Sequence, residues 1–244
     1  MSQPNPRIFV ALDVPTAEEA LQLVSSLQHL PLHYKVGMQL FYQEGLPLVQ
    51  AIQAKTGKTV FVDLKLHDIP TTVANAAEVL LKNGVCFFNC HCMGGLEMMQ
   101  TLAKRVRTVS ESLTLPEKPT VLGVTVLTSM DEAALKRDLQ VGQTSEDYVV
   151  SLARMAQDAG LSGVVCSARE VAALRAACGN DFVLLTPGIR LDSGDHQDQK
   201  RVMTPIQALQ NGASDLVIGR PITHAADPVL AAEDIIASLG AIEL

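Results

Sequence analysis

The sequence of 244 residues predicts a (β/α)₈ barrel, in which a β-strand followed by an α-helix is repeated eight times. Short apolar runs rich in β-branched or aromatic residues alternate with longer segments of helical periodicity along the whole chain. No linker divides the chain, and its length is typical of one barrel, so we expect a single domain over residues 1–244. The alternative is an open doubly wound sheet. However, the turn after the first run reads LDVPTAEE and lacks a glycine-rich dinucleotide fingerprint.

The expected strands are short apolar runs, several of which end in a polar residue or in glycine. In chain order they cover residues 7–13, 33–38, 59–66, 86–91, 120–127, 163–167, 182–188 and 216–219. Parallel strands that are buried on both faces have this composition. In a barrel, the active site forms at the carboxyl ends of such strands.

Capping residues and glycines mark the helices between these strands. Thr16 with Glu19, and Ser167 with Glu170, have the spacing of a capping box. Thr204 combines a cap with the first-turn proline that follows it. Helical segments end at glycines, which adopt the left-handed conformation that often closes a helix. These are Gly57, Gly84, Gly160, Gly179 and Gly212.

The charge balance limits the partners of the protein. Nineteen Lys and Arg residues against 26 Asp and Glu residues give a net charge of -7. This balance argues against binding to nucleic acid or to an anionic membrane surface, but it leaves room for a local basic pocket that binds phosphate. The hydrophobic content of 48% excludes a disordered chain.

The N-terminus and the cysteines indicate a cytoplasmic protein. The first apolar run is interrupted at Asp13 and Pro15, too early for a signal peptide or a membrane span. Five cysteines, an odd number, are expected to be reduced. Cys90, His91 and Cys92 have metal-binding side chains, but alternation along a strand points His91 away from the two cysteines, so we expect no zinc site there.

The segment DLKLHD, residues 63–68, is the most informative motif. Asp63 and Lys65 lie two apart on an expected strand and so project to the same face. A buried structural ion pair would also explain them. Lys35 on the second strand, Asp13 at the end of the first, and Asp68 add alternating charges. Such an arrangement lets buried ionised groups tolerate one another and keeps Lys65 protonated, which favours a functional site.

Two loops after the last strands indicate a phosphate site. They read TPGIR, residues 186–190, and IGRPIT, residues 218–223. Their glycines let backbone N–H groups approach an oxyanion, and Arg190 or Arg220 can add a charged contact. The alternative is that both glycines only make turns and both arginines are solvated. Together the loops predict a phosphorylated small-molecule substrate.

DLKLHDIPTTV, taken with Asp13, Lys35, VTVLTS, TPGIR and VIGRPIT, resembles the orotidine 5'-phosphate decarboxylase family over essentially the whole chain. The resemblance implies conversion of orotidine 5'-phosphate to uridine 5'-phosphate in pyrimidine biosynthesis. It also implies a homodimer with active sites shared across its interface and no metal or organic cofactor. Nucleic acid and membranes are not expected as partners.

The resemblance also implies residue roles. Lys65 donates the proton at the carbon that loses carbon dioxide, within a charged array completed by Lys35, Asp63 and Asp68. Asp68 and Thr72 act at the neighbouring subunit's site. The remaining substrate contacts are Asp13 and Lys35 at the ribose, Thr128 at the pyrimidine, Gln199, Gly219 and Arg220 at the phosphate, and Ile69, Pro187 and Arg190 nearby. Residues 188–204 resemble a loop that closes over the phosphate.

Three other functions remain open. A magnesium-dependent phosphosugar lyase or synthase, such as hexulose-phosphate synthase, shares the DxKxxD strand, but the ammonium of Lys35 would repel a cation. A Schiff-base aldolase built on Lys65 needs a neutral amine, which flanking carboxylates disfavour. A non-catalytic phosphonucleotide-binding barrel has little use for a buried charged array that is costly to desolvate.

Overall fold

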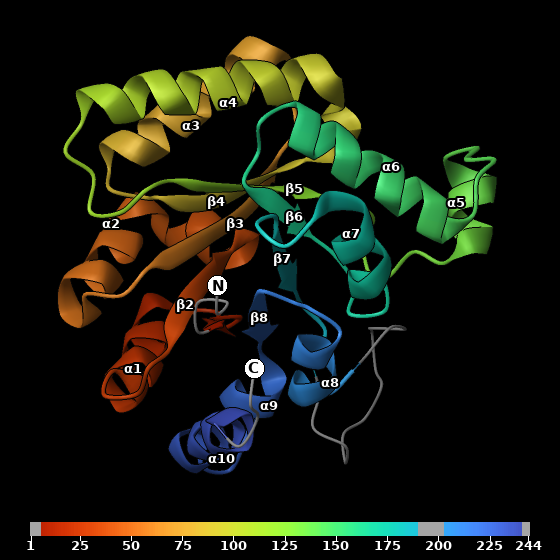
Figure 1. Cartoon of the computed structure of the whole chain (residues 1–244). Helices are drawn as coiled ribbons and strands as arrows, with labels where there is room; N and C mark the ends of the chain where they lie inside the picture. Colours follow the sequence, from red (N-terminus) through yellow and green to blue (C-terminus); the bar gives the residue numbers. More distant parts are fainter. Residues whose placement is uncertain (1–5, 190–202, 241–244) are drawn as a thin grey trace.

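The structure, a computed structural model, describes residues 6–189 and 203–240, and its strands close into a parallel barrel (Figure 1). Each strand pairs with its sequence neighbour, and the last pairs with the first. The strands are β1 Arg7–Ala11, β2 His33–Gly37, β3 Val60–Leu66, β4 Phe87–His91, β5 Thr120–Val124, β6 Gly163–Val165, β7 Val183–Thr186 and β8 Asp215–Ile218. The predicted fold class and all eight predicted strands are confirmed.

Helices lie around the outside of the strands (Figure 1). They are α1 Ala17–Leu27, α2 Met38–Thr56, α3 Pro70–Lys82, α4 Gly95–Ser112, α5 Glu132–Asp138, α6 Ser145–Asp158, α7 Val171–Cys178, α8 Pro205–Gln210, α9 Arg220–Thr223 and α10 Pro228–Gly240, with a 3₁₀ turn, η1, at Cys92–Gly94. Within the described ranges, no helix is both long and apolar enough to cross a membrane.

Two of the three predicted helix starts are confirmed. The Thr16 hydroxyl accepts a hydrogen bond from the Glu19 N–H before α1, and Thr204 forms a capping box before α8. The predicted start at Ser167 is wrong. Glu170 donates its backbone N–H to the Ser167 carbonyl, while its carboxylate accepts from the Ser167 N–H at 2.9 Å. These bonds close a separate turn, so α7 begins only at Val171.

Four predicted strands extend too far at their carboxyl ends. Pairing stops at Ala11, Val124, Val165 and Thr186, whereas the predicted runs continue for two or three more residues. Several of these later residues leave the sheet to line a pocket. Strand pairing and pocket formation compete for the same segment of chain, and the pattern of apolar residues does not distinguish them.

The inside of the barrel is filled by apolar side chains below the carboxyl ends of the strands. Phe9, Phe61 and Phe87 pack with ring centroids 4.9 to 5.9 Å apart. A larger apolar layer fills the space between strands and helices. Side chains of the described residues therefore fill the interior of the barrel, as is usual for this fold, and no channel runs through it.

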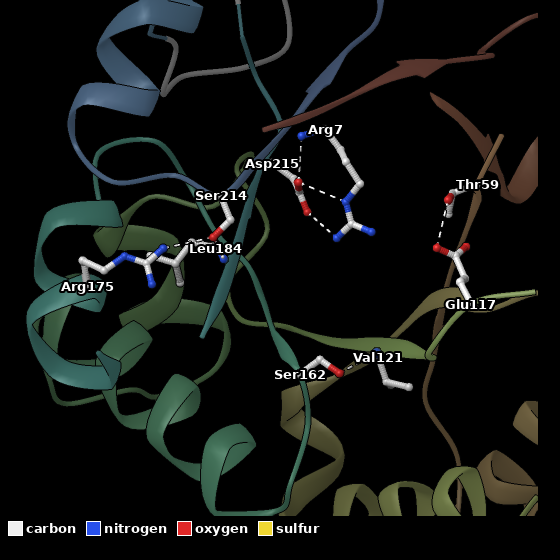
Figure 2. A network of polar contacts seen from close by, with 9 residues as sticks. All are labelled: Arg7, Thr59, Glu117, Val121, Ser162, Arg175, Leu184, Ser214 and Asp215. Atoms are coloured by element: carbon white, nitrogen blue, oxygen red, sulfur yellow. Dashed lines mark hydrogen bonds and ion pairs between the residues drawn. The ribbon is translucent and has the colours of Figure 1, made fainter. Parts of the chain in front are cut away.

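Arg7 and Asp215 close the barrel next to this aromatic cluster, where β1 meets β8 (Figure 2). The guanidinium donates to both carboxylate oxygens, from Nε at 3.2 Å and from Nη2 at 2.8 Å. The Arg7 backbone N–H also donates to Asp215, and the guanidinium carbon lies 4.7 Å from the centroid of the Phe87 ring. The charges of Arg7 and Asp215 thus neutralise each other beside the aromatic cluster inside the barrel.

We expect Asp215→Ala to lower the free energy of unfolding by about 3 kcal/mol, because it leaves the partly buried Arg7 charge without its carboxylate. Urea denaturation followed by circular dichroism measures the change. Arg137→Ala, which removes an exposed ion pair with Asp138 on α5, is the control and should leave the midpoint unchanged. Equal midpoints for Asp215→Ala and wild type would contradict this role.

Candidate active site

A pocket of about 440 Å³ opens at the carboxyl ends of the strands. Residues of β1, β2, β3, β5, β6, β7 and β8 contribute to its wall. Its size suits a small-molecule ligand. The sequence-predicted residues that line it are Asp13, Lys35, Asp63, Lys65, Thr128, Pro187, Gly219 and Arg220. The fold therefore brings together predicted residues from both ends of the chain, from Asp13 to Arg220.

Two lysines and two aspartates form a continuous chain of charges in this pocket. Lys65 Nζ lies 2.8 Å from Asp63 Oδ1, and Lys35 Nζ lies 3.5 Å from Asp63 Oδ2. Lys35 Nζ also lies 3.1 Å from Asp13 Oδ1. Signs alternate from Lys65 to Asp13, so each lysine faces at least one carboxylate. This is the array that the sequence predicted, without Asp68.

The central carboxylate, Asp63, is held in its ionised form. Burial by itself would raise its pKa, because a charged group loses hydration. The charges of Lys35 and Lys65 and the hydrogen bonds from Lys65 and Asn89 outweigh that effect and lower the pKa below its usual value. Asp63 can therefore serve as a permanent negative partner for both lysines.

The backbone of β3 departs from a regular strand within the motif. Val62 pairs with Phe88 and Leu66 pairs with Cys90, so β3 uses four residues where β4 uses two. Lys65 has a φ of 54°, in the left-handed region that residues other than glycine seldom adopt. Asp63 and Lys65 do meet, as predicted, but an irregularity in the strand accompanies their contact, and simple alternation does not describe it.

Asn89, on β4, was not among the predicted site residues. Its Oδ1 accepts the Lys65 backbone N–H at 2.7 Å, and its Nδ2 donates to Asp63 Oδ1 at 2.7 Å. The signal in the sequence was one buried amide in the apolar run CFFNCH. A buried amide requires partners, but the sequence does not say which.

The loops after β7 and β8 also line the pocket. Pro187 and Gly188 come from the first loop, and Gly219 and Arg220 come from the second. Gly188 has a φ of 79°, which a glycine adopts without strain. His224, which sequence analysis did not predict, lines the pocket four residues after Arg220. Backbone amides near a cationic side chain can bind an oxyanion.

Three of the predicted site residues that the structure describes do not line this pocket. Asp68, Ile69 and Thr72 lie at or just before the start of α3 and are exposed, with Ile69 at 68%. The Asp68 carboxylate accepts the Ile69 N–H at 2.6 Å. Arg190 and Gln199 lie outside the described residues, as does most of the predicted loop 188–204.

The predicted separation of Cys90 and Cys92 from His91 is confirmed. Both cysteines are fully buried in the layer between strands and helices, and burial raises the pKa of Cys90 to about 12. His91 is only partly buried, and its Nδ1 accepts the Met93 N–H at 3.3 Å. Across the part of the chain that the structure covers, no group of three or more His, Cys, Asp or Glu side chains is placed to hold a metal ion.

Fold and site together define a (β/α)₈-barrel enzyme whose strand ends carry an alternating lysine–aspartate array. The chain belongs to the orotidine 5'-phosphate decarboxylase / HUMPS family, whose model matches residues 6–235.

Individual relatives cover nearly the whole chain. Orotidine 5'-phosphate decarboxylase from Moorella thermoacetica is 46% identical over 233 residues, which is 96% of this chain and 92% of that protein. The enzyme of the same name from Syntrophus aciditrophicus is 53% identical over 202 residues, or 82% of this chain and 79% of that one. The crystal structure of orotidine 5'-phosphate decarboxylase from Lactobacillus acidophilus superposes with a TM-score of 0.84 at 36% identity, covering 97% of this chain and 100% of that one.

Proposed function

We propose that this protein is a cytoplasmic, cofactor-independent enzyme of pyrimidine biosynthesis that converts orotidine 5'-phosphate to uridine 5'-phosphate and carbon dioxide. The observation that carries this proposal is the Lys65 ammonium, 2.8 Å from the Asp63 carboxylate inside the pocket. The names and close similarity of the relatives support the same reaction.

The chemistry explains why such an array is needed. When the bond from the ring carbon to the carboxylate breaks, carbon dioxide leaves and the electron pair stays on the ring carbon. That carbanion has no conventional electron sink, so electrostatic stabilisation must supply most of the catalysis. The Lys65 ammonium stabilises the developing charge more than it stabilises the delocalised carboxylate of the substrate. It then transfers a proton to the carbon.

The neighbours of Lys65 hold its ammonium in place. Asp63 Oδ1 accepts a hydrogen bond from Lys65 Nζ at 2.8 Å. Lys35 Nζ lies 3.5 Å from the second oxygen of Asp63, so both oxygens of the carboxylate have a partner. Lys65 therefore enters the reaction as a preorganised cation.

The other pocket residues each contact a different part of the substrate. Asp13 and Lys35 contact the ribose hydroxyls, and Thr128 contacts the pyrimidine. The phosphate lies at the loops after β7 and β8. The residues of this phosphate site are Pro187, Arg190, Gln199, Gly219 and Arg220. The positions of two of these residues support this division. Asp13 follows the end of β1 and Gly219 follows β8 beside it, and a Cβ added at Gly219 would lie 3.8 Å from Asp13 Oδ2.

The functional unit in this proposal is a homodimer with shared sites. Asp68, Ile69 and Thr72 act at the site of the partner subunit, which accounts for their absence from the pocket of their own chain. Exposed apolar side chains on or next to α2 and α3 support such an interface: Met38, Tyr42, Ile69 and Val79. Tyr42 and Ile69 are the most exposed of these, at 75% and 68%, and a dimer interface over α2 and α3 would cover them.

A magnesium-dependent phosphosugar lyase fits the array less well. Lys35 Nζ lies between Asp13 and Asp63, within 3.5 Å of both carboxylates. An ammonium at this position already neutralises the oxygens that a divalent cation would need.

The decisive experiment adds orotidine 5'-phosphate to protein pretreated with excess EDTA and follows the loss of the orotate-ring absorbance. We expect rapid loss with stoichiometric formation of uridine 5'-phosphate. No loss with folded protein would contradict the proposed function, and phosphosugars with magnesium would then be tested.

The phosphate group should contribute to turnover as well as to affinity. Gripping this remote group provides binding energy for aligning the ring with Lys65, so orotidine without phosphate should have a kcat at least about 100-fold lower. Saturation kinetics with both compounds measure the ratio. Equal kcat values at saturation would show that the phosphate site serves binding only.

A further inference from the structure

One buried amide lies directly behind the reactive pair. Asn89 is 1% exposed on β4, between Phe88 and Cys90, which are both fully buried. Burying an amide is unfavourable unless hydrogen bonds replace those lost from water. Both ends of the Asn89 amide are bonded, and both bonds go to the DLK segment of β3.

We propose that Asn89 is a positioning residue that sets the geometry of the Lys65–Asp63 pair. This inference rests on the proposed function. A single rigid amide contacts the main chain of one partner and the carboxylate of the other, each at 2.7 Å. The relative position of the two groups is therefore defined by one side chain from the neighbouring strand.

The first contact holds a strained backbone. Lys65 has a φ of 54°, and a residue with a Cβ persists there only when its surroundings enforce the conformation. Its N–H lies in the irregular stretch where β3 falls out of register with β4. By accepting this N–H, Asn89 Oδ1 replaces the regular ladder bond and stabilises the conformation that directs Lys65 towards Asp63.

The second contact, from Asn89 Nδ2, fixes the orientation of the Asp63 carboxylate, so that each of its oxygens faces a different lysine. Asp63 Oδ1 accepts from Asn89 Nδ2 at 2.7 Å and from Lys65 Nζ at 2.8 Å. Its Oδ2 is left for Lys35 Nζ at 3.5 Å. Without the amide donor, the carboxylate can rotate about its terminal bond and the ammonium of Lys65 can follow it. A displacement of about 1 Å at reacting groups costs about 100-fold in rate.

The test compares Asn89→Leu with Phe88→Leu. Asn89→Leu replaces the amide with an apolar side chain that can make neither bond. Phe88→Leu reduces packing at the next residue of β4, whose side chain lies in the layer between strands and helices. Steady-state kinetics with orotidine 5'-phosphate give kcat, and calorimetric titration gives the Kd of uridine 5'-phosphate.

We expect Asn89→Leu to lower kcat about 100-fold while the Kd of uridine 5'-phosphate changes by less than about 3-fold. Phe88→Leu should lose thermal stability and keep the wild-type kcat. The proposal is overturned if kcat of Asn89→Leu stays within a few-fold of wild type. It is also overturned if kcat and product binding are lost together, because that pattern indicates general unfolding of the pocket.

A second variant and a structural measurement complete the test. Asn89→Ser keeps a hydroxyl that can donate and accept, but its single oxygen lies closer to the backbone than the two polar atoms of the amide and cannot reproduce both 2.7 Å contacts, so its kcat should lie between those of wild type and Asn89→Leu. Crystal structures of the variants should show Lys65 out of the left-handed region or separated from Asp63 Oδ1. An unchanged pair would refute the positioning role even if the wild-type protein had no decarboxylase activity, so the two proposals can fail separately.

Discussion

Lys65→Ala is expected to lower kcat with orotidine 5'-phosphate by at least about 10⁴-fold. The substitution removes the cation that stabilises the carbanion and the group that protonates it, so both contributions are lost together. The fold should survive, because Asp63 keeps Lys35 at 3.5 Å and the Asn89 amide at 2.7 Å. Loss of the orotate-ring absorbance at saturating substrate measures the effect.

A lysine outside the pocket provides the matched control. Lys82 forms an exposed ion pair with Glu78 on α3, so Lys82→Ala removes the same charge without touching the array. It should retain the wild-type kcat. A decrease of less than tenfold for Lys65→Ala, in protein with a native circular dichroism spectrum, would mean that another group protonates the product.

The periodicity of the sequence predicts the fold well and the strand ends poorly. Eight apolar runs alternate with helical segments, several of them marked by caps or glycines, and a closed parallel barrel buries all eight runs. The carboxyl end of each strand is harder to predict, because the same short segment can continue the ladder or turn into the pocket wall. Ser167 and Glu170 show a related ambiguity, since their bonds close a turn before α7 instead of starting it.

The charged residues of the site were predictable because their type and spacing are unusual for a buried strand. Asp63 and Lys65 stand out in DLKLHD, and Lys35 stands out between apolar neighbours. Asn89 could not be assigned in the same way. Its role depends on the register between β3 and β4, which shifts after Val62 and is not encoded in any local pattern.

For the residues just before α3, the predicted site and the observed position differ. Asp68 belongs to the same motif as Lys65, yet it lies on the surface and contacts Ile69. In the proposed dimer, Lys65 acts in the pocket of its own chain and Asp68 acts in the pocket of the partner subunit. This explanation can be tested without a structure of the dimer.

Mixing Lys65→Ala protein with Asp68→Ala protein is expected to restore about one quarter of the wild-type activity, although each variant alone is nearly inactive. Random exchange of subunits makes about half of all dimers hybrid. Each hybrid has one site that combines an intact Lys65 with an intact Asp68 from the other subunit, and one site that lacks both. The ring-absorbance assay on an equimolar mixture measures the recovery.

Lys65→Ala mixed with Asp63→Ala is the control that gives this experiment its meaning. Asp63 and Lys65 reach the same pocket from a single chain, so every site in a hybrid of these two variants lacks one of them. No activity should return in that mixture. Native mass spectrometry of differently labelled chains establishes that exchange has taken place. If hybrids form and the Lys65→Ala and Asp68→Ala pair stays inactive, Asp68 does not act across the interface.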